Sequence, residues 1–330
     1  MSAEADAAPI RVAFIGGWGR SGSTLLAALL GEVPRLVPVG ELRYVWDRGL
    51  RDDELCGCGE RFSECAFWQE VGRAAFGGWD RIDAAEVLAL DQAVTRHRYL
   101  PLMLARRLNR GYTEKLDRYA GYLARLYAGI REVSGSDMIV DATKDPSYAF
   151  VLRRVPGLRF NVVHIVRDSR GAAFSWSKTV ARPERTSGTN ELMPQYGALH
   201  AGLRWVAYNL LFHLVSLVGV KRVFLRYEAL VSAPGREVER VLRELGSPPQ
   251  NGDLAGIAGD SFELRPHHTI GGNPMRFRHG RMRVRADQAW RSAMEPRQRW
   301  QVVAVTWPLM LGYGYLGAGR PSPQTTTTQG

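Results

Sequence analysis

The chain of 330 residues is 45% hydrophobic and 23% charged, and its formal net charge is +11. These proportions exclude an intrinsically disordered chain and are typical of a globular protein that is long enough to bury a core. Residues 1–9 have no basic segment followed by an apolar one, so we expect no signal peptide and a cytoplasmic location. The apolar runs 205–220 and 302–316 are interrupted by polar, proline or glycine residues, which favours buried helices over membrane spans.

Short apolar segments, most of them rich in β-branched residues, predict five buried strands: Val12–Ile15, Leu36–Val39, Met138–Val140, Phe160–Val166 and Arg222–Leu225. Helical patterns separate them: Ser23–Gly31, several helices within Ala84–Ser134 with a break near Pro101, Pro146–Arg154, Ser169–Lys178, Ala198–Val218 and Pro234–Leu245. This alternation predicts an α/β fold with three layers, in which helices flank a central parallel β-sheet.

We expect a single domain over residues 10–318, with residues 84–134 as a helical insertion. The segments 1–9 and 319–330 are expected to be disordered tails. The stretch 181–194 is rich in small and polar residues, and we interpret it as a mobile loop rather than a linker between domains.

The most informative motif follows the first predicted strand. Gly17–Thr24 nearly fits the phosphate-loop pattern G-x-x-x-x-G-K-[ST], in a glycine-rich turn that leads into a helix. The N–H groups of such a turn and the positive end of the helix dipole bind anions. Ser23 stands where the pattern has lysine, and Arg20 supplies a cation instead. We therefore expect a loop that holds phosphate without the lysine of nucleotide triphosphatases.

Charged residues follow four of the predicted strands. Arg20, Glu41, Lys144 and Arg167 come after the first four strands in chain order. Ligands of open parallel sheets bind at the carboxyl ends of the strands, so we expect these side chains to converge. Arg167 and Ser175, about two helical turns further on, predict a second anion clamp. The alternative for Arg167 is a surface salt bridge with a neighbour such as Asp168.

These residues resemble the motifs of sulfotransferases that use 3′-phosphoadenosine 5′-phosphosulfate (PAPS). Gly19–Leu25 resembles the 5′-phosphosulfate loop of this family, and Val166–Ser175, with its arginine and serine eight positions apart, looks like the 3′-phosphate motif. Two further segments are similar to bacterial members: Gly271–Phe277 followed by Trp290, and Leu55–Gly59 followed by Cys65, Phe67 and Trp68. The resemblance covers about residues 10–315.

The resemblance implies a phosphate-loop fold and a reaction that requires no metal. It implies that the donor is bound by these residues: Gly19, Arg20, Ser21, Gly22, Ser23, Thr24, Arg167 and Ser175. A hydroxyl or amine of the acceptor then attacks the sulfur in line with the departing 5′-phosphate. Arg20, Lys144 and the loop N–H groups would stabilise the negative charge that develops on the leaving oxygen.

The resemblance also suggests the general base. Glu41 resembles the glutamate base of the tyrosylprotein branch of the family, and Lys144-Asp145-Pro146 matches the catalytic lysine motif of that branch. The alternatives are an ion pair between Glu41 and Arg20 or Arg43, and a surface position for Lys144. Many small-molecule members use a central histidine, which we do not find in the corresponding context.

The C-terminal part is basic. Nine arginines lie between Arg265 and Arg299 against two acids, Asp287 and Glu295, an excess of seven positive charges. We interpret most of this run as a solvated face. Arg276 follows a Gly-Gly-Asn-Pro turn and is our candidate from this run for a contact with the 3′-phosphate of the donor.

Cys56, Cys58 and Cys65 are the only cysteines. Because no fourth ligand lies near them in the sequence, they are weak evidence for zinc, and we predict no metal site. One disulfide with a free thiol and three reduced thiols both stay open, and we assign these residues no chemistry.

Two other functions compete with sulfuryl transfer. A phosphate-loop kinase of a small molecule would need the missing lysine and a strand-end aspartate for magnesium, and only Asp141 is available. A nucleic-acid-binding protein would account for the positive charge, but the sequence has no helix-turn-helix, RNA-binding or zinc-knuckle pattern. We expect a nucleotide donor and no nucleic-acid partner. The acceptor stays open among small molecules, glycolipids and glycans, as does the oligomeric state.

Overall fold

The computed structural model describes residues 8–100, 103, 109–179, 192 and 194–316. Of the expected tails, only residues 8 and 9 belong to this part of the chain, and of the expected loop 181–194 only residues 192 and 194 do. The predictions made for the other residues of these segments lie outside the described residues.

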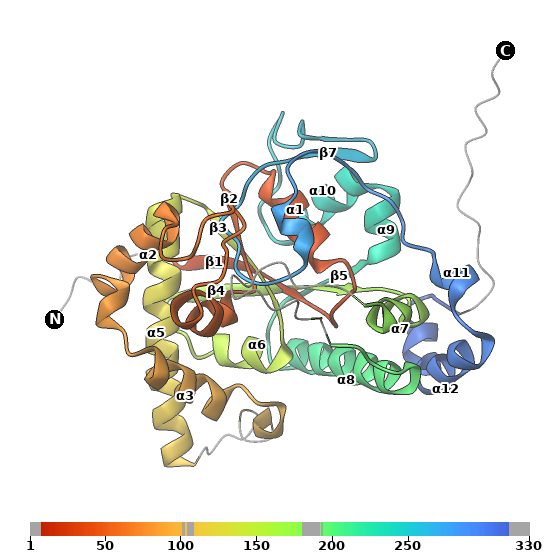
Figure 1. Cartoon of the computed structure of the whole chain (residues 1–330), viewed down its shortest axis with the longest axis horizontal. Helices are drawn as coiled ribbons and strands as arrows, with labels where there is room; N and C mark the ends of the chain where they lie inside the picture. Colours follow the sequence, from red (N-terminus) through yellow and green to blue (C-terminus); the bar gives the residue numbers. More distant parts are fainter. Residues whose placement is uncertain (1–7, 101–102, 104–108, 180–191, 193, 317–330) are drawn as a thin grey trace.

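A five-stranded parallel sheet forms the centre of the protein (Figure 1). Its strands are β1 (Ile10–Gly16), β2 (Leu36–Gly40), β3 (Met138–Lys144), β4 (Leu158–Val166) and β5 (Arg222–Arg226). The strand order is β2-β3-β1-β4-β5, so β1 lies in the middle between β3 and β4. All five predicted strands are confirmed, and the loop that follows β1 lies at the centre of the carboxyl edge.

Alternate residues of the central strand enter two different cores, one on each face of the sheet. Val12 and Phe14 pack in a cluster with apolar residues of α5 (Arg110–Ser134), α6 (Pro146–Leu152) and α8 (Ala198–Leu217). Ala13 and Ile15 pack in a second cluster with α1 (Ser23–Gly31), α9 (Tyr227–Ser232) and α10 (Pro234–Glu244). Figure 1 shows the two helical layers on opposite sides of the sheet. The predicted three-layer α/β fold is confirmed.

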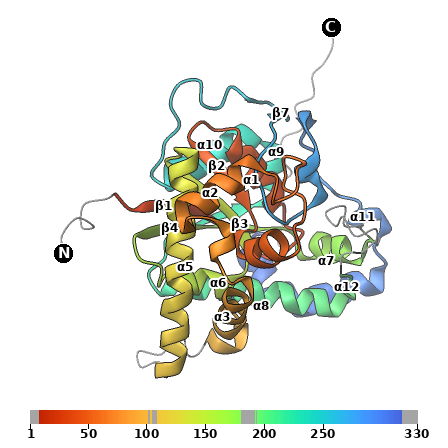
Figure 2. The ribbon, with the colours of Figure 1, turned by 60° about the vertical axis from the view of Figure 1, so that its left-hand side comes forward.

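Among the described residues, short helices and three longer ones connect β2 to β3. They are η1 (Leu42–Val45), η2 (Trp46–Arg51), α2 (Ala66–Phe76), η3 (Trp79–Arg81), α3 (Ala84–Val94), η4 (His97–Tyr99) and α5. In Figure 2, α2 lies alongside α5, against which it packs. Helices occur in the described parts of 84–134 as expected, whereas the predicted break near Pro101 lies outside the described residues. Helix α2 extends the helical part of this connection toward β2.

The C-terminal part completes the layers and adds a small antiparallel sheet. It contains α7 (Ser169–Ser177), β6 (Ile257–Ala258), β7 (Ser261–Leu264), η5 (Pro274–Phe277), β8 (Gly280–Arg283), α11 (Trp290–Ala293) and α12 (Pro296–Gly312). The apolar run 302–316 is mostly in α12, which packs on α7 and α8. Among the described residues, no helix combines the length and apolar character that crossing a membrane requires.

Candidate active site

The phosphate loop, residues 16–24, joins the end of β1 to the start of α1. Gly22 caps α1 with φ 92°, and a Cβ there would lie 2.5 Å from the ring of Tyr227, so the position requires glycine. Gly22 has no side chain to accept the first N–H groups of α1, which suits an anion as their acceptor. Ser21 is buried, and its Oγ has no hydrogen-bond partner among the described residues. The loop thus presents donors arranged for an anionic ligand.

On one side, the loop contacts α7 and the residue that follows β4. The Arg167 guanidinium donates to the carbonyl of Arg20 at 3.3 Å and forms an ion pair with Asp287, also at 3.3 Å. Arg167 is only 5% exposed. The Trp176 indole N–H donates to the carbonyl of Gly19 at 3.0 Å. Arg167 therefore lies beside the phosphate loop and supports its backbone, and the predicted contact of Arg167 with a phosphate stays a prediction.

Arg20 and Ser175 lie on this same α7 side. The Arg20 guanidinium is stacked over the Trp176 ring, 5.2 Å from its centroid, and burial lowers the pKa of Arg20. Ser175 is half-buried in α7, one residue before Trp176. Two arginines therefore lie on the α7 side, Arg20 in the loop and Arg167 paired with Asp287.

On the other side, a pocket lies between α1, the ends of β2 and β3, and the segment 264–276. Its empty volume is about 480 Å³ when the open solvent at its mouth is included. Thr24, Glu41, Lys144, Gly272 and Arg276 line it, together with apolar side chains. A Cβ added to Gly272 would lie 3.6 Å from Glu41 Oε1 and 4.0 Å from Thr24 Oγ1. The end of the phosphate loop and the Glu41 carboxylate therefore face the same space.

Glu41 and Lys144 form an ion pair in this pocket. Their side chains are 11% and 17% exposed, so the pair is largely shielded from water. The main-chain N–H of Glu41 donates to Ile270 O at 2.6 Å, and that of Ile270 donates to Val39 O at 3.0 Å. These bonds attach the C-terminal segment to the end of β2. The alternative pairing of Glu41 with Arg43 does not occur.

Arg43 instead connects the helical insertion to the residue after Lys144. Its guanidinium bonds Asp145 at 2.6 Å and Asp91 of α3 at 3.1 Å. Asp145 caps α6, as the sequence predicts, by accepting from Ser147 N at 2.8 Å. Burial alone would raise the pKa of Asp145, but the hydrogen bond from His97 and the charge of Arg43 lower it to about 2. This network fixes the chain on both sides of Lys144, whose φ of 64° is in the left-handed region.

Arg276 lines the pocket but uses its guanidinium to join two chain segments. Nη1 donates to Thr269 O at 2.6 Å and Nη2 donates to Leu55 O at 2.9 Å. The side chain is buried and stacks on Phe277. Arg276 thus holds the segment 269–276 against the loop at residue 55, and its predicted contact with a phosphate stays a prediction.

Asp141 is the strand-end aspartate that a magnesium-dependent reaction would need. It is fully buried and accepts hydrogen bonds from Tyr127 and Thr143, each at 2.6 Å. Burial raises its pKa to about 6 in spite of these bonds. The Asp141 carboxylate therefore forms its hydrogen bonds within the core between β3 and α5.

Sequence reasoning missed Arg48 and the residues 269–270 that precede the Gly-Gly-Asn-Pro turn. A Cβ added to Gly271 would lie 3.0 Å from Arg48 Nη1 and 3.4 Å from Glu41 Cβ, so this arginine is close to the candidate base. Arg48 also stacks on Tyr44. No local pattern marks residue 48, because its role depends on a contact with a segment more than 200 residues away.

The sequence profile of the sulfotransferase family matches residues 13–251. No curated protein matches the chain. Among solved structures, the chain is similar to the sulfotransferase domain of the olefin synthase from Synechococcus PCC 7002, with 18% identity over 92% of this chain and 96% of that one and a TM-score of 0.49. It is also similar to a sulfotransferase domain from the curacin biosynthetic pathway, with 17% identity over 91% of this chain and 98% of that one and a TM-score of 0.45. The sulfotransferase STF1 from Mycobacterium tuberculosis H37Rv has 14% identity over 76% of this chain and 70% of its own, with a TM-score of 0.40.

Proposed function

The chain belongs to the sulfotransferase family, and we propose that it transfers the sulfuryl group of PAPS to a hydroxyl or amine of an acceptor. The observation that carries this proposal is the pocket in which Thr24, Glu41 and Lys144 face one space next to the phosphate loop. It combines an anion site, a carboxylate and a cation, which are the three groups that sulfuryl transfer without a metal requires.

The donor is held across the phosphate loop. Residues 19–24 bind the 5′-phosphosulfate through main-chain N–H groups and hydroxyls. The buried Oγ of Ser21, which has no hydrogen-bond partner in the described part of the chain, supports this assignment. Arg167 and Ser175 bind the 3′-phosphate on the α7 side, where Arg20 adds a further positive charge. Arg276 acts as a positioning residue, because its two terminal nitrogens hold the carbonyls of Thr269 and Leu55.

Transfer is an in-line displacement. The acceptor oxygen or nitrogen forms a bond to sulfur, while the bond between sulfur and the bridging oxygen of the 5′-phosphate breaks. Glu41 takes the proton of the acceptor, and adenosine 3′,5′-bisphosphate leaves with the negative charge. Lys144 is the cation next to Glu41 in the pocket, and we assign it to the bridging oxygen, where fixed donors are worth ~10²–10³ in rate.

The acceptor enters the pocket on the side that the segment 264–276 forms. Apolar side chains such as Leu264 and Met275 line this part of the pocket next to Glu41. The lining suits an acceptor that presents its nucleophile beside an apolar group, which includes phenolic compounds and glycolipids.

The competing kinase reaction has little support. Asp141 is buried and saturated by hydrogen bonds from Tyr127 and Thr143, so it is not available to hold magnesium at the phosphate loop. Ser23 also replaces the lysine that phosphate-loop kinases place on the transferred phosphate.

A transfer assay with ³⁵S-labelled PAPS tests the proposal. The purified chain is incubated with panels of phenols, glycolipids and glycans, with and without EDTA and with Lys144→Ala as the control. We expect labelled product with at least one acceptor class, without any need for added magnesium and lost in Lys144→Ala. Phosphorylation of the same acceptors by ATP, abolished by EDTA and restored by magnesium, would overturn the proposal in favour of a kinase.

A further inference from the structure

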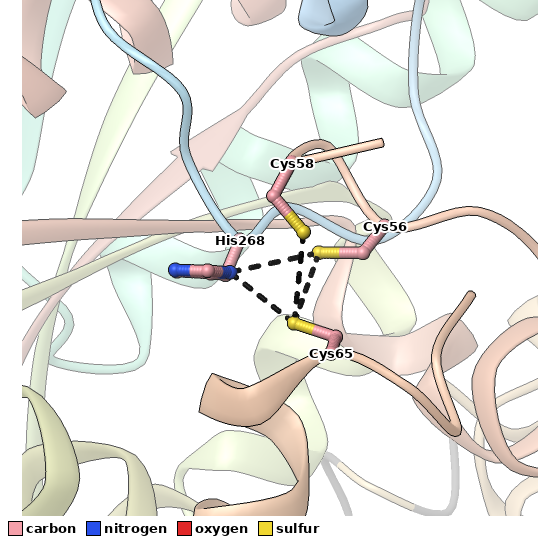
Figure 3. A group of neighbouring side chains, drawn as sticks. All are labelled: Cys56, Cys58, Cys65 and His268. Atoms are coloured by element: carbon pink, nitrogen blue, oxygen red, sulfur yellow. Dashed lines mark hydrogen bonds between the residues drawn. The ribbon is translucent and has the colours of Figure 1, made fainter. Parts of the chain in front are cut away.

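The three cysteines lie together with a histidine from a distant part of the chain. Figure 3 shows the sulfur atoms of Cys56, Cys58 and Cys65 and one ring nitrogen of His268 pointing toward one another. The three Sγ atoms and a ring nitrogen of His268 all lie within 4.8 Å of one another. The sequence argument lacked a fourth ligand, because His268 stands 203 positions after Cys65.

The separations between these atoms fit a common central ion. The Sγ atom of Cys65 lies 3.7 Å from that of Cys56 and 3.7 Å from that of Cys58. A tetrahedral zinc ion with Zn–S bonds of about 2.3 Å separates two sulfurs by about 3.8 Å. The His268 Nδ1 atom lies 3.2 Å from Cys65 Sγ and 3.9 Å from Cys56 Sγ, on either side of the ~3.6 Å that the same tetrahedron requires. A disulfide would need sulfurs about 2.05 Å apart, and all three cysteines are free.

The surrounding chain holds the four side chains in this arrangement. A Cβ added to Gly57 would lie 2.3 Å from Thr269 Oγ1 and 2.5 Å from His267 O, so only glycine lets the Cys56–Cys58 turn approach the histidine segment. The His268 ring stacks on Phe67 with centroids 4.8 Å apart. Arg276 donates hydrogen bonds to both Leu55 O and Thr269 O. Leu55 directly precedes Cys56, and Thr269 directly follows His268. Cys56 and Cys65 are buried, and this burial limits access of solvent to the cluster.

We propose that Cys56, Cys58, Cys65 and His268 bind one zinc ion as a closed structural site. Three thiolates and a neutral imidazole in a tetrahedral arrangement are a ligand set that zinc prefers. All four positions belong to side chains, so the ion has no open position for a substrate, and the site is distinct from the sulfuryl-transfer chemistry. This inference is independent of the proposed function.

The position of the site gives it a structural role. His268 is followed at once by Thr269–Gly272, which pair with the end of β2 and run beside Glu41. The cysteines belong to the loop that leads into α2. Zinc would therefore fasten the C-terminal wall of the pocket to the helical connection between β2 and β3, across more than 200 residues of chain.

Metal analysis of the full chain tests this proposal. The protein is purified without a polyhistidine tag under reducing conditions, and its zinc content is measured by inductively coupled plasma mass spectrometry. We expect about one zinc ion per chain, and loss of zinc in Cys58→Ser and in His268→Asn. His279→Asn is the matched control, because His279 is an exposed histidine of the same C-terminal part, and it should retain the zinc.

A second measurement avoids variants that fail to fold. The wild-type protein is titrated with a mercurial that blocks thiols, and released zinc is followed with a chromophoric chelator. Zinc should leave as the three thiols react. The proposal is wrong if the reduced wild-type chain neither contains zinc nor takes it up when zinc is supplied. It is equally wrong if the freshly isolated chain has the mass of a disulfide, two hydrogens below the reduced form, or if His268→Asn keeps the full zinc content.

Discussion

The two sides of the candidate pocket are built differently. The phosphate loop is one continuous segment between β1 and α1 with glycine at its turn, and hydrogen bonds from Arg167 and Trp176 support its backbone. The other side brings together Glu41, Lys144 and the segment 269–276 from three distant parts of the chain. Hydrogen bonds of Ile270 with Val39 and Glu41, and of Arg276 with Thr269 and Leu55, hold these parts together.

This difference separates two properties of the protein. The N–H groups of a continuous loop stay adjacent along the chain even when one remote contact weakens. The assembled wall, which consists of Glu41, Lys144 and the segment 269–276, loses its geometry when any of these hydrogen bonds is removed. Each of these bonds closes a loop of many residues. We therefore expect changes in the loop to weaken donor binding and changes in the assembled wall to lower turnover while donor binding persists.

The largest effect is expected for Glu41→Gln, which keeps the side-chain volume and removes the proposed base. Turnover should fall by ~10²–10⁴, whereas the affinity for adenosine 3′,5′-bisphosphate should hardly change. Steady-state kinetics with the best acceptor and calorimetry with the bisphosphate measure the two quantities. Glu132→Gln, on the exposed face of α5, is the control. Full turnover in Glu41→Gln would refute the assignment of the base and leave family membership untouched.

Gly22→Ala tests the loop itself. Its φ of 92° is unfavourable for alanine by roughly 1–2 kcal/mol, and the close contact with Tyr227 should add about 1–3 kcal/mol. Gly219→Ala is the matched control, because Gly219 has φ 91° but no atom within 4 Å of an added Cβ. Urea denaturation should show a larger loss of unfolding free energy for Gly22→Ala, which alone should bind the bisphosphate more weakly. Equal losses in the two variants would mean that the Tyr227 contact is unimportant.

Asp145→Asn tests whether the buried Arg43–Asp145 pair stabilises the segment around Lys144. The pKa of Asp145 is about 2 in the folded chain against an ordinary value of 3.8, which corresponds to about 2 kcal/mol of stabilisation. Because the pKa is lowered on folding, this stabilisation is present above pH 3.8 and is lost as the pH falls through about 2. The difference in unfolding free energy from wild type should thus be largest near neutral pH and shrink in acid.

The control for this variant is Asp137→Asn, which removes an exposed ion pair with Arg35. Exposed pairs contribute about 0–1 kcal/mol, so its unfolding free energy should change little at any pH. If Asp145→Asn were as mild as this control, the buried Arg43–Asp145 pair would not support the segment around Lys144.

The smallest effect is expected for Arg167→Met. The KM for PAPS should rise about tenfold, since a charged hydrogen bond contributes about 1.5–3 kcal/mol. Turnover at saturating donor should change less, because the proposed catalytic pair Glu41–Lys144 is untouched. Arg159→Met, at an exposed position earlier in β4, should leave the KM as it is. An unchanged KM in Arg167→Met would mean that this arginine serves only the backbone of the loop.

The continuous half of the site was predictable from the sequence. The apolar run of β1, the glycines of the turn and the apolar start of α1 are adjacent, so their pattern appears within 20 residues. The start of α6 was equally predictable, because Asp145 is a favoured N-cap residue and Pro146 is favoured at the first helical position. Helix α2 also carries a local signal, since Trp68, Val71 and Phe76 follow helical spacing, but sequence reasoning overlooked it.

The assembled half was not predictable by such reasoning. The bridge between Gly40 and Ile270 is a single pair of residues, and it produces no periodicity. His268 likewise becomes a neighbour of Cys65 only when the C-terminal segment crosses the end of β2. Contacts between segments that are more than 200 residues apart depend on the whole fold, which is why the fourth candidate metal ligand was missed.

Calorimetric titration with adenosine 3′,5′-bisphosphate and with ATP, both in EDTA, tests the central claim most directly because it needs no knowledge of the acceptor. We predict that the bisphosphate binds at least about tenfold more tightly, a difference of about 1.4 kcal/mol, and that its affinity is independent of magnesium. Equal affinities for the two nucleotides, or binding that appears only when magnesium is added, would contradict the account.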